Sequence, residues 1–172
     1  DIYLDDSDRT NNNWTPIGQY VWDKNGSYYE SFKGNFDGDG HTVGNIYISS
    51  KDKCQGFFGS VENAVIANLN VTGYIDQAST AGGLCGMAYS STFRNCSSSV
   101  RMQCERSTGG LIGNLSGNSI VKSCSSNSAG VSVAKGQVGG IIGLIDSSKV
   151  YGKLYTDGTN VTIENCVNYS HI

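Results

Sequence analysis

The sequence predicts an all-β protein, a parallel β-helix (β-solenoid) of about four to five rungs behind an N-terminal cap. Three observations lead to this prediction. A glycine-framed apolar pair returns at a nearly constant interval, a second short motif recurs in step with it, and no stretch has the apolar spacing of an amphipathic helix. Self-similarity at a fixed period in the twenties is typical of solenoids.

The predicted elements divide the 172 residues as one domain. Residues 1–42 form the cap, which includes Trp14, and a first β segment. Residues 43–172 form repeats of about 27 residues, each long enough for about three short strands and their turns. An insertion is expected near 149–160, because Ser123 and Asn165 are 42 residues apart where earlier repeats of the same motif are 27 and 28 apart.

The glycine-framed pair occurs as GFFG at 56–59, GGLCG at 82–86, GGLIG at 109–113 and GGIIG at 139–143. The last glycines are separated by 27, 27 and 30 residues; they are Gly59, Gly86, Gly113 and Gly143. Glycine is favoured where the backbone turns sharply or closely approaches its neighbour. We therefore expect each pair to form a corner of the coil followed by an inward strand.

The second motif has the form apolar-x-Asn/Ser-apolar and occurs at 43–46, 66–69, 93–96, 121–124 and 163–166. Stacking of rungs at about 4.8 Å would align its last residues in one inward column. We expect this column to contain Leu69, Cys96, Cys124 and Cys166, and a second to contain Phe57, Leu84, Leu111 and Ile141. Buried Cys acts as a small hydrophobe, and parallel rungs point their Cβ atoms the same way, so we expect the three cysteines to be reduced.

Several classes of function are disfavoured by composition. The net charge is −3 with no basic run, which makes nucleic acid and anionic membrane poor partners. No apolar run is long enough to span a membrane. With two histidines and no C-x-x-C, we expect no metal site and no cofactor. The start at Asp1, without Met or a signal-like stretch, suggests a processed protein or an excised fragment.

Acidic residues offer two candidate sites, and both have simpler interpretations. Asp37-Gly-Asp39-Gly-His41 lacks the distant Glu of a calcium loop, so we expect a tight turn with Gly38 and Gly40 at positive φ. The acids after residue 60 fall at different offsets from the glycine frames. No column of paired carboxylates, as a glycosidase would need, is therefore expected.

Aromatic residues are the best indication of binding. Trp22, Tyr28 and Tyr29 lie in a polar loop before the first regular rung, and Tyr151 and Tyr155 lie in the expected insertion. Exposed Trp and Tyr present large flat surfaces at small entropic cost to sugar rings or protein partners. The alternative is that both groups cap the ends of the solenoid.

The order of several motifs resembles the opening of GLUG-repeat proteins. These motifs are WTPIG at 14–18, FKGNFDGDGHTVGNIYI at 32–48 and GFFG at 56–59. The resemblance implies a right-handed β-solenoid from a large secreted or surface-anchored bacterial protein, of the kind found in adhesins and in immunoglobulin A peptidases. The H-E-x-x-H motif of those peptidases is absent here. The chain departs from the family pattern in its Cys-for-Leu column and its long last repeat.

Together these features predict a non-catalytic, adhesin-like module located outside the cell or on its surface. Its expected partners are a host glycan or glycoprotein and the other domains of a larger parent chain. Two alternatives remain open at this stage. One is a rigid structural spacer, and the other is a carbohydrate-active enzyme of the parallel β-helix type.

Overall fold

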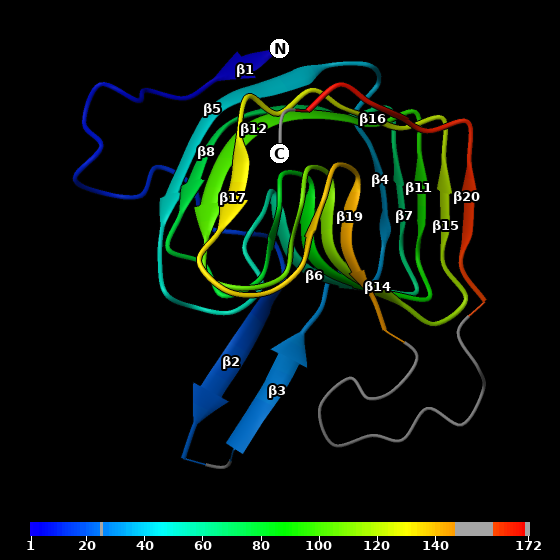
Figure 1. Cartoon of the computed structure of the whole chain (residues 1–172), viewed down its shortest axis with the longest axis horizontal. Coiled ribbons are helices and arrows are strands. Elements are labelled where there is room, and N and C mark those ends of the chain that lie inside the picture. The colour runs from blue at the N-terminus through cyan, green and yellow to red at the C-terminus, as the bar shows by residue number, and fades with distance from the viewer. Residues whose placement is uncertain (25, 147–159, 171–172) are drawn as a thin grey trace.

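The computed structural model of the chain is a β-solenoid of about four turns (Figure 1). The structure describes residues 1–24, 26–146 and 160–170. All regular secondary structure in these ranges is β-strand. The strands stack in parallel, as predicted, so that each turn of the coil adds one strand to each of several sheets.

The long sheet receives the longest strand of each turn. Its order is β1-β5-β8-β12-β16-β21, and β17 also pairs with β12. Its strands are β1 (Ile2–Tyr3), β5 (Thr42–Ser49), β8 (Asn70–Asp76), β12 (Ser97–Cys104), β16 (Ser125–Ser126), β17 (Val131–Val133) and β21 (Val167–Asn168).

Three shorter sheets complete each turn. The β6–β19 sheet contains β6 (Phe58–Glu62), β10 (Cys85–Tyr89), β14 (Ile112–Ser116) and β19 (Ile142–Ile145). The β4–β20 sheet contains β4 (Asn35–Asp37), β7 (Val65–Ala67), β11 (Thr92–Arg94), β15 (Ile120–Lys122) and β20 (Thr162–Glu164). The β9–β18 sheet contains β9 (Ala81–Gly82), β13 (Thr108–Gly109) and β18 (Val138–Gly139).

The core consists of inward columns that run along the solenoid. Both predicted columns are confirmed through the first three copies, whose members are buried: Phe57, Leu84 and Leu111 in one, Leu69, Cys96 and Cys124 in the other. Their last members, Ile141 and Cys166, are half-buried against the same core. All six cysteines are free thiols in the structure.

Each glycine frame spans a corner and the strand that follows it, as predicted: the chain bends at 56–57, 83–84, 110–111 and 140–141, directly before β6, β10, β14 and β19. Gly59, Gly86, Gly113 and Gly143 lie inside β6, β10, β14 and β19, and none of them has positive φ. Glycine is required at these positions because the main chains of neighbouring rungs approach each other closely. A Cβ on Gly113 would lie 2.6 Å from the carbonyl oxygen of Gly86 and 2.7 Å from that of Ala81. The last glycine of each frame therefore lets neighbouring rungs touch backbone to backbone in the strand that follows the bend.

The second motif supplies a further corner in each turn of the coil. Asn68, Asn95, Ser123 and Asn165 have φ values of 53°, 53°, 53° and 51°, between a strand of the β4–β20 sheet and a strand of the long sheet. Asn tolerates this left-handed conformation better than most residues. The earliest copy differs, because Asn45 (φ 62°) lies at an irregularity in the pairing of β5 with β8.

Two of the corner asparagines form a side-chain ladder with Asp37. Asn95 Nδ2 donates to Asn68 Oδ1 at 3.1 Å, and Asn68 Nδ2 donates to Asp37 Oδ1 at 2.9 Å. The same Asp37 oxygen accepts a bond from the backbone N–H of Asp39, which forms the predicted tight turn. Positive φ falls on Asp39 and Gly40 rather than on Gly38. A Cβ on Gly38 would lie 2.5 Å from the carbonyl oxygen of Asn68, so this glycine also serves close approach.

The N-terminal cap covers the first rung with aromatic rings. Trp14 stacks on Phe57 with a centroid distance of 4.6 Å, and its Nε1 donates to the Phe57 carbonyl oxygen at 3.0 Å. Phe32 packs on Phe58 at 5.4 Å. The regular stack begins before residue 43, since β4 already pairs with β7.

A hairpin interrupts the rung that lies above β6. Ile17 and Phe32 each form a parallel bridge to the β6 region, with Phe58 and Val61 respectively. Between them the chain leaves the stack as the antiparallel strands β2 (Gln19–Asp23) and β3 (Gly26–Glu30), which project from the coil (Figure 1). The hairpin is therefore an insertion in one strand of the first rung.

We predict that Asn95→Ala lowers the free energy of unfolding by about 1–2 kcal/mol, because alanine resists the left-handed conformation. Asn95→Gly should cost less, since glycine adopts this φ freely and loses only an exposed side-chain hydrogen bond. Urea unfolding followed by circular dichroism measures both values. Equal losses would show that the ladder, and not the corner conformation, is what matters at this position.

Candidate functional site

A groove lies on the outer side of the β6–β19 sheet. Its floor includes Met87 and Asn114, which are register partners on β10 and β14. Their strand neighbours Ala88 and Leu115 are buried in the core, so the floor residues point outward. The volume of the groove is about 550 Å³.

Successive turns of the coil line the groove beside this floor. They contribute Lys51, Lys53, Cys54, Ser79, Thr80, Glu105, Arg106 and Ser107, and Tyr29 of β3 and Asp146 complete the lining. The side chains of Lys51, Glu105 and Arg106 are exposed and make no ion pair or hydrogen bond within the described part of the chain. These three charges are therefore available to a ligand.

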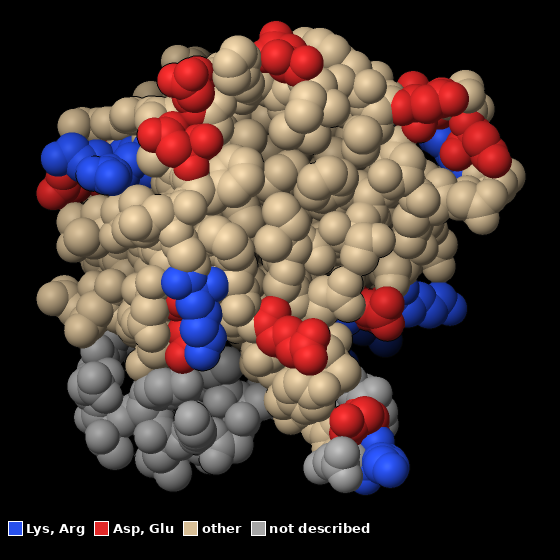
Figure 2. Space-filling model, turned by 180° about the vertical axis from the view of Figure 1, so that it is seen from behind, with Lys and Arg blue, Asp and Glu red and all other residues tan. Residues whose placement is uncertain are grey.

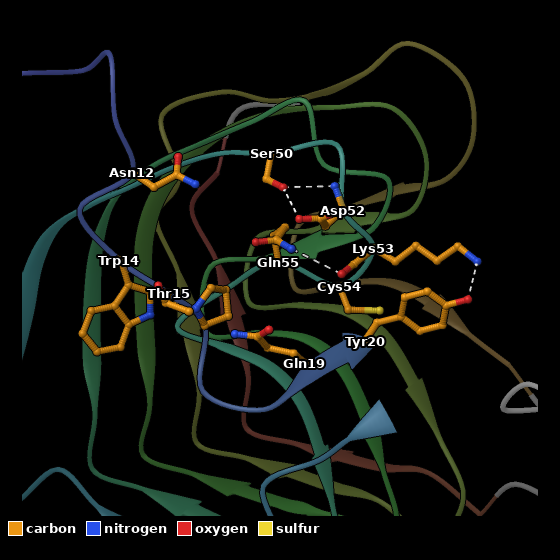
Figure 3. Close-up of a pocket in the computed structure, with 11 residues that line it drawn as sticks. Asn12, Trp14, Thr15, Gln19, Tyr20, Ser50, Asp52, Lys53, Cys54 and Gln55 are labelled. Atoms are coloured by element: carbon orange, nitrogen blue, oxygen red, sulfur yellow. Dashed lines mark hydrogen bonds between the residues drawn. The ribbon is translucent and has the colours of Figure 1, made fainter. Parts of the chain in front are cut away.

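A smaller cavity of about 160 Å³ adjoins the groove and shares Lys53 and Cys54 with it (Figure 3). The segment before β2, the start of β2 and the turn before β6 line it. The other lining residues are Asn12, Trp14, Thr15, Pro16, Gln19, Tyr20, Ser50, Asp52 and Gln55. Polar side chains from three segments thus converge beside the cap.

Lys53 and Tyr20 lie together where the two cavities meet. Lys53 Nζ donates to the Tyr20 hydroxyl at 3.3 Å and is 4.5 Å from the centroid of the ring, within the range of a cation–π contact. A hydrogen bond from Ser27, with the nearby Lys53, holds the pKa of Tyr20 below its usual range. Tyr20 also packs edge-on against its cross-strand partner Tyr29, at 5.1 Å.

The predicted aromatic residues do not form one shared platform. Tyr28 and Tyr29 are neighbours in β3 and so point to opposite faces of the hairpin. Tyr28 is 43% exposed, whereas Tyr29 is half-buried and lines the groove. Trp22 lies in β2 opposite Ser27. Tyr151 and Tyr155 lie outside the described residues.

The charged residues of the groove were missed by the sequence reasoning, although a signal was present. Lys51, Lys53, Ser79 and Arg106 each precede the last glycine of their frame by six to eight residues. A common offset places side chains on one side of a solenoid. Glu105 and Asp146 line the same groove although they lie at different offsets from the last glycines of their frames. Their offsets therefore give no indication in the sequence that the two carboxylates are close.

The described residues show no large patch of one charge on the face in Figure 2, no metal-binding cluster and no membrane-spanning helix. The face in Figure 2 carries scattered cations and anions in small groups and no single-sign patch. Within the ranges 1–24, 26–146 and 160–170, no group of three or more His, Cys, Asp or Glu residues could hold a metal ion. No helix in these ranges is long and apolar enough to cross a membrane.

Cys54 is the one thiol among the described residues that line the groove, and its reactivity as a nucleophile is suppressed. It is 2% exposed, and burial raises the pKa of its thiol to about 12. The thiol is therefore protonated near neutral pH, whereas a nucleophile must be the thiolate. Among the described lining residues, Cys54 consequently serves as packing beneath the groove.

The proteins that the chain resembles are longer than the region they share with it. No family model matches it, so the resemblance to GLUG-repeat proteins stays a prediction. The chain is 35% identical over 99 residues to Halomucin of Haloquadratum walsbyi. The aligned region covers 54% of this chain and 1% of Halomucin. A candidate immunoglobulin A1 protease of Bacteroides ovatus shares the fold, with a TM-score of 0.57 and 24% identity over 79% of this chain and 51% of that one.

We predict that iodoacetamide at pH 8 modifies the native chain first at Cys166, the half-buried cysteine of the last rung. Cys54 should react only after unfolding, because it is buried and protonated at this pH. Peptide mass spectrometry of timed samples measures the order, and Cys166→Ser provides the control with a slow native reaction. Rapid native labelling of Cys54 would contradict this assignment and make Cys54 a candidate nucleophile.

Proposed function

We propose that the chain is a non-catalytic, adhesin-like recognition module that binds a glycan, presented on a host glycoprotein, along the groove of the β6–β19 sheet. One observation carries this proposal. The groove combines a volume of about 550 Å³ with three charged side chains that have no ion-pair or hydrogen-bond partner among the described residues, those of Lys51, Glu105 and Arg106. A ligand that binds them need not displace such a partner, and its hydrogen bonds would replace those that these groups make with water.

The lining suits a sugar chain. Hydroxyl and amide groups of Ser79, Thr80, Ser107 and Asn114 can both donate and accept hydrogen bonds, as sugar hydroxyls do. Tyr29 adds an aromatic surface for the apolar face of a ring. Because rungs repeat at about 4.8 Å, a chain that runs along the axis can meet similar turns in succession.

An extracellular or cell-surface location accompanies this proposal. The likeness to Halomucin and to the candidate immunoglobulin A1 protease supports it. The chain spans 1% of Halomucin and about half of the solved structure, so the module would work beside other domains of a longer protein.

Catalysis is the second candidate, because Glu105 and Asp146 both line the groove. Two carboxylates that flank a bound sugar are what a glycoside hydrolase requires. We favour recognition without catalysis because Glu105 is exposed to solvent, whereas the general acid of a glycoside hydrolase is set apart by an apolar, enclosed environment. A rigid spacer is the third candidate, and the stacked core with its side-chain ladder is compatible with it.

We predict that a glycan and host-glycoprotein array probed with the purified chain shows selective binding. The double variant Lys51→Ala/Arg106→Ala should weaken this binding at least tenfold, because each lost charge-assisted hydrogen bond contributes about 1.5–3 kcal/mol. Tyr28→Ala is the matched control, since Tyr28 lies on the opposite face of the hairpin from the groove residue Tyr29.

The other outcomes separate the candidates. Binding that is lost in Tyr28→Ala and kept in the double variant would move the site to the exposed face of the hairpin. Release of reducing ends from a bound glycan would favour the hydrolase, and Glu105→Gln should then abolish it. Absence of binding above background would leave the spacer as the better description.

A further inference from the structure

The groove carries an excess of positive charge in a chain that is acidic overall. Its described lining contains three cations and two carboxylates, which belong to Lys51, Lys53, Arg106, Glu105 and Asp146. The whole chain has a net charge of −3. The groove therefore differs in sign from the molecule around it, and a concave site of this kind attracts anionic ligands.

The register of the strands places the cations on alternate turns of the coil. Parallel pairing aligns one residue in each of three successive turns, namely Gln55, Ala81 and Thr108. The residues two positions earlier therefore occupy equivalent places beside the groove: Lys53, Ser79 and Arg106. Rungs are about 4.8 Å apart, so the cationic first and third turns are separated by about 10 Å along the axis.

The turn between the two cationic ones is neutral. Residues 77–80 carry no charged side chain, and Ser79 and Thr80 present hydroxyl groups to the groove. Neither hydroxyl group forms a hydrogen bond within the described part of the chain. The groove thus changes along its length from a positive turn to a hydroxyl-bearing turn and then to a second positive turn.

A sugar chain with an acidic group on every second unit matches this alternation. One unit of an extended β-linked chain is about as long as one rung spacing, so acidic groups on alternate units recur at the separation of the two cationic turns. The Arg106 guanidinium can bind a carboxylate or a sulfate through two parallel hydrogen bonds, and the Lys51 ammonium can pair with the next acidic group. The hydroxyl groups of the middle turn can bind the neutral unit between them.

The two carboxylates of the groove restrict the ligand further. Glu105 adjoins Arg106 in the third turn, and Asp146 follows β19 at the end of the floor sheet. Each carboxylate can accept hydrogen bonds from the hydroxyl groups of neutral sugars but repels a nearby anion. A chain that is acidic at every unit would also bring an anion to the neutral middle turn. Acidic groups on alternate units therefore suit the groove better.

The lysines of the first turn differ in how they are held. Lys53 Nζ lies 3.3 Å from the Tyr20 hydroxyl and extends toward that ring (Figure 3). Lys53 therefore contributes a positive charge in a fixed place. Lys51 and Arg106 have no ion-pair or hydrogen-bond partner among the described residues, so their side chains can turn toward a ligand.

We propose that the glycan of the groove is acidic, with a carboxylate or sulfate group on every second sugar, and that Lys51 and Arg106 bind two successive acidic groups. Lys53 adds its charge to the first of these contacts. This inference rests on the proposed function and names the class of glycan that the same site takes. It accounts for cations on alternate turns, which recognition of a neutral glycan would not require.

Isothermal titration calorimetry with four β-linked oligosaccharides of equal length tests this inference. They are a neutral chitin oligomer, a hyaluronan oligomer with a carboxylate on alternate units, a keratan sulfate oligomer with a sulfate on alternate units, and a polymannuronate oligomer with a carboxylate on every unit. We expect the better of the two alternating chains to bind about tenfold more tightly than the chitin oligomer, and also more tightly than polymannuronate. This advantage should shrink between about 0.05 and about 0.5 M NaCl, because salt screens exposed charges.

Variants of the groove test the roles of single residues. Lys51→Ala and Arg106→Ala should each reduce the preference for the alternating acidic chain about fivefold, whereas Glu105→Gln should strengthen its binding by removing a like charge. Ser79→Lys should shift the preference toward polymannuronate, because it places a cation on the middle turn. Arg101→Ala is the matched control, since this exposed cation lies on β12 of the long sheet. Circular dichroism establishes that each variant is folded.

The remaining outcomes separate this inference from the proposed function. Equal affinity for the neutral and acidic chains would overturn the inference and leave recognition of a glycan intact. A preference for the acidic chain that Lys51→Ala and Arg106→Ala both preserve would also overturn it. If none of the four oligosaccharides binds but the glycan array detects another ligand, the inference alone fails. A blank array would overturn the proposed function as well.

Discussion

Parallel stacking in register, with backbone touching backbone, is the constraint on which the rest of this structure depends. Each rung buries its inward side chains only on its neighbours, so every element must return to the same place in the cross-section. Glycines inside β10 and β14 permit this approach, because a Cβ there would enter the main chain of the adjacent turn. The repeat length, the core columns and the position of the groove all follow from this requirement.

Periodicity explains which parts of the fold could be predicted from the sequence. The columns through Leu84 and Cys96 were predictable, because a buried side chain must recur at the same point of each period. The corners in the glycine frames were predictable too, but the last glycine of each frame lies in the strand, because glycine marks both sharp turns and close contacts and the sequence does not distinguish them. The further corners at Asn68 and Asn95 were missed, since these residues turn the chain through a left-handed conformation that their side chains tolerate.

The candidate site was less predictable for a related physical reason. Turns on the outside of a solenoid have no packing requirement, so their residue types do not repeat even when their positions do. Lys51, Ser79 and Arg106 lie at similar offsets from their frames, but a serine stands between the two cations, and only the three-dimensional arrangement shows that they line one groove. The hairpin that carries Tyr29 interrupts a strand of the first rung. Its Asn25-Gly26 pair between strand-like runs is a typical hairpin signal, which the interpretation of this segment as a polar loop overlooked.

The ladder from Asn95 through Asn68 to Asp37 also gives the solenoid a direction. Both amides donate toward the N-terminal end, so their dipoles are aligned, and the series ends on a carboxylate that can only accept. The hydrogen bond from Asn68 is the main reason that the pKa of Asp37 lies below its usual range. An anion at the positive end of aligned amides is the arrangement found at the start of an α-helix, reproduced here by side chains alone in a fold built from strands.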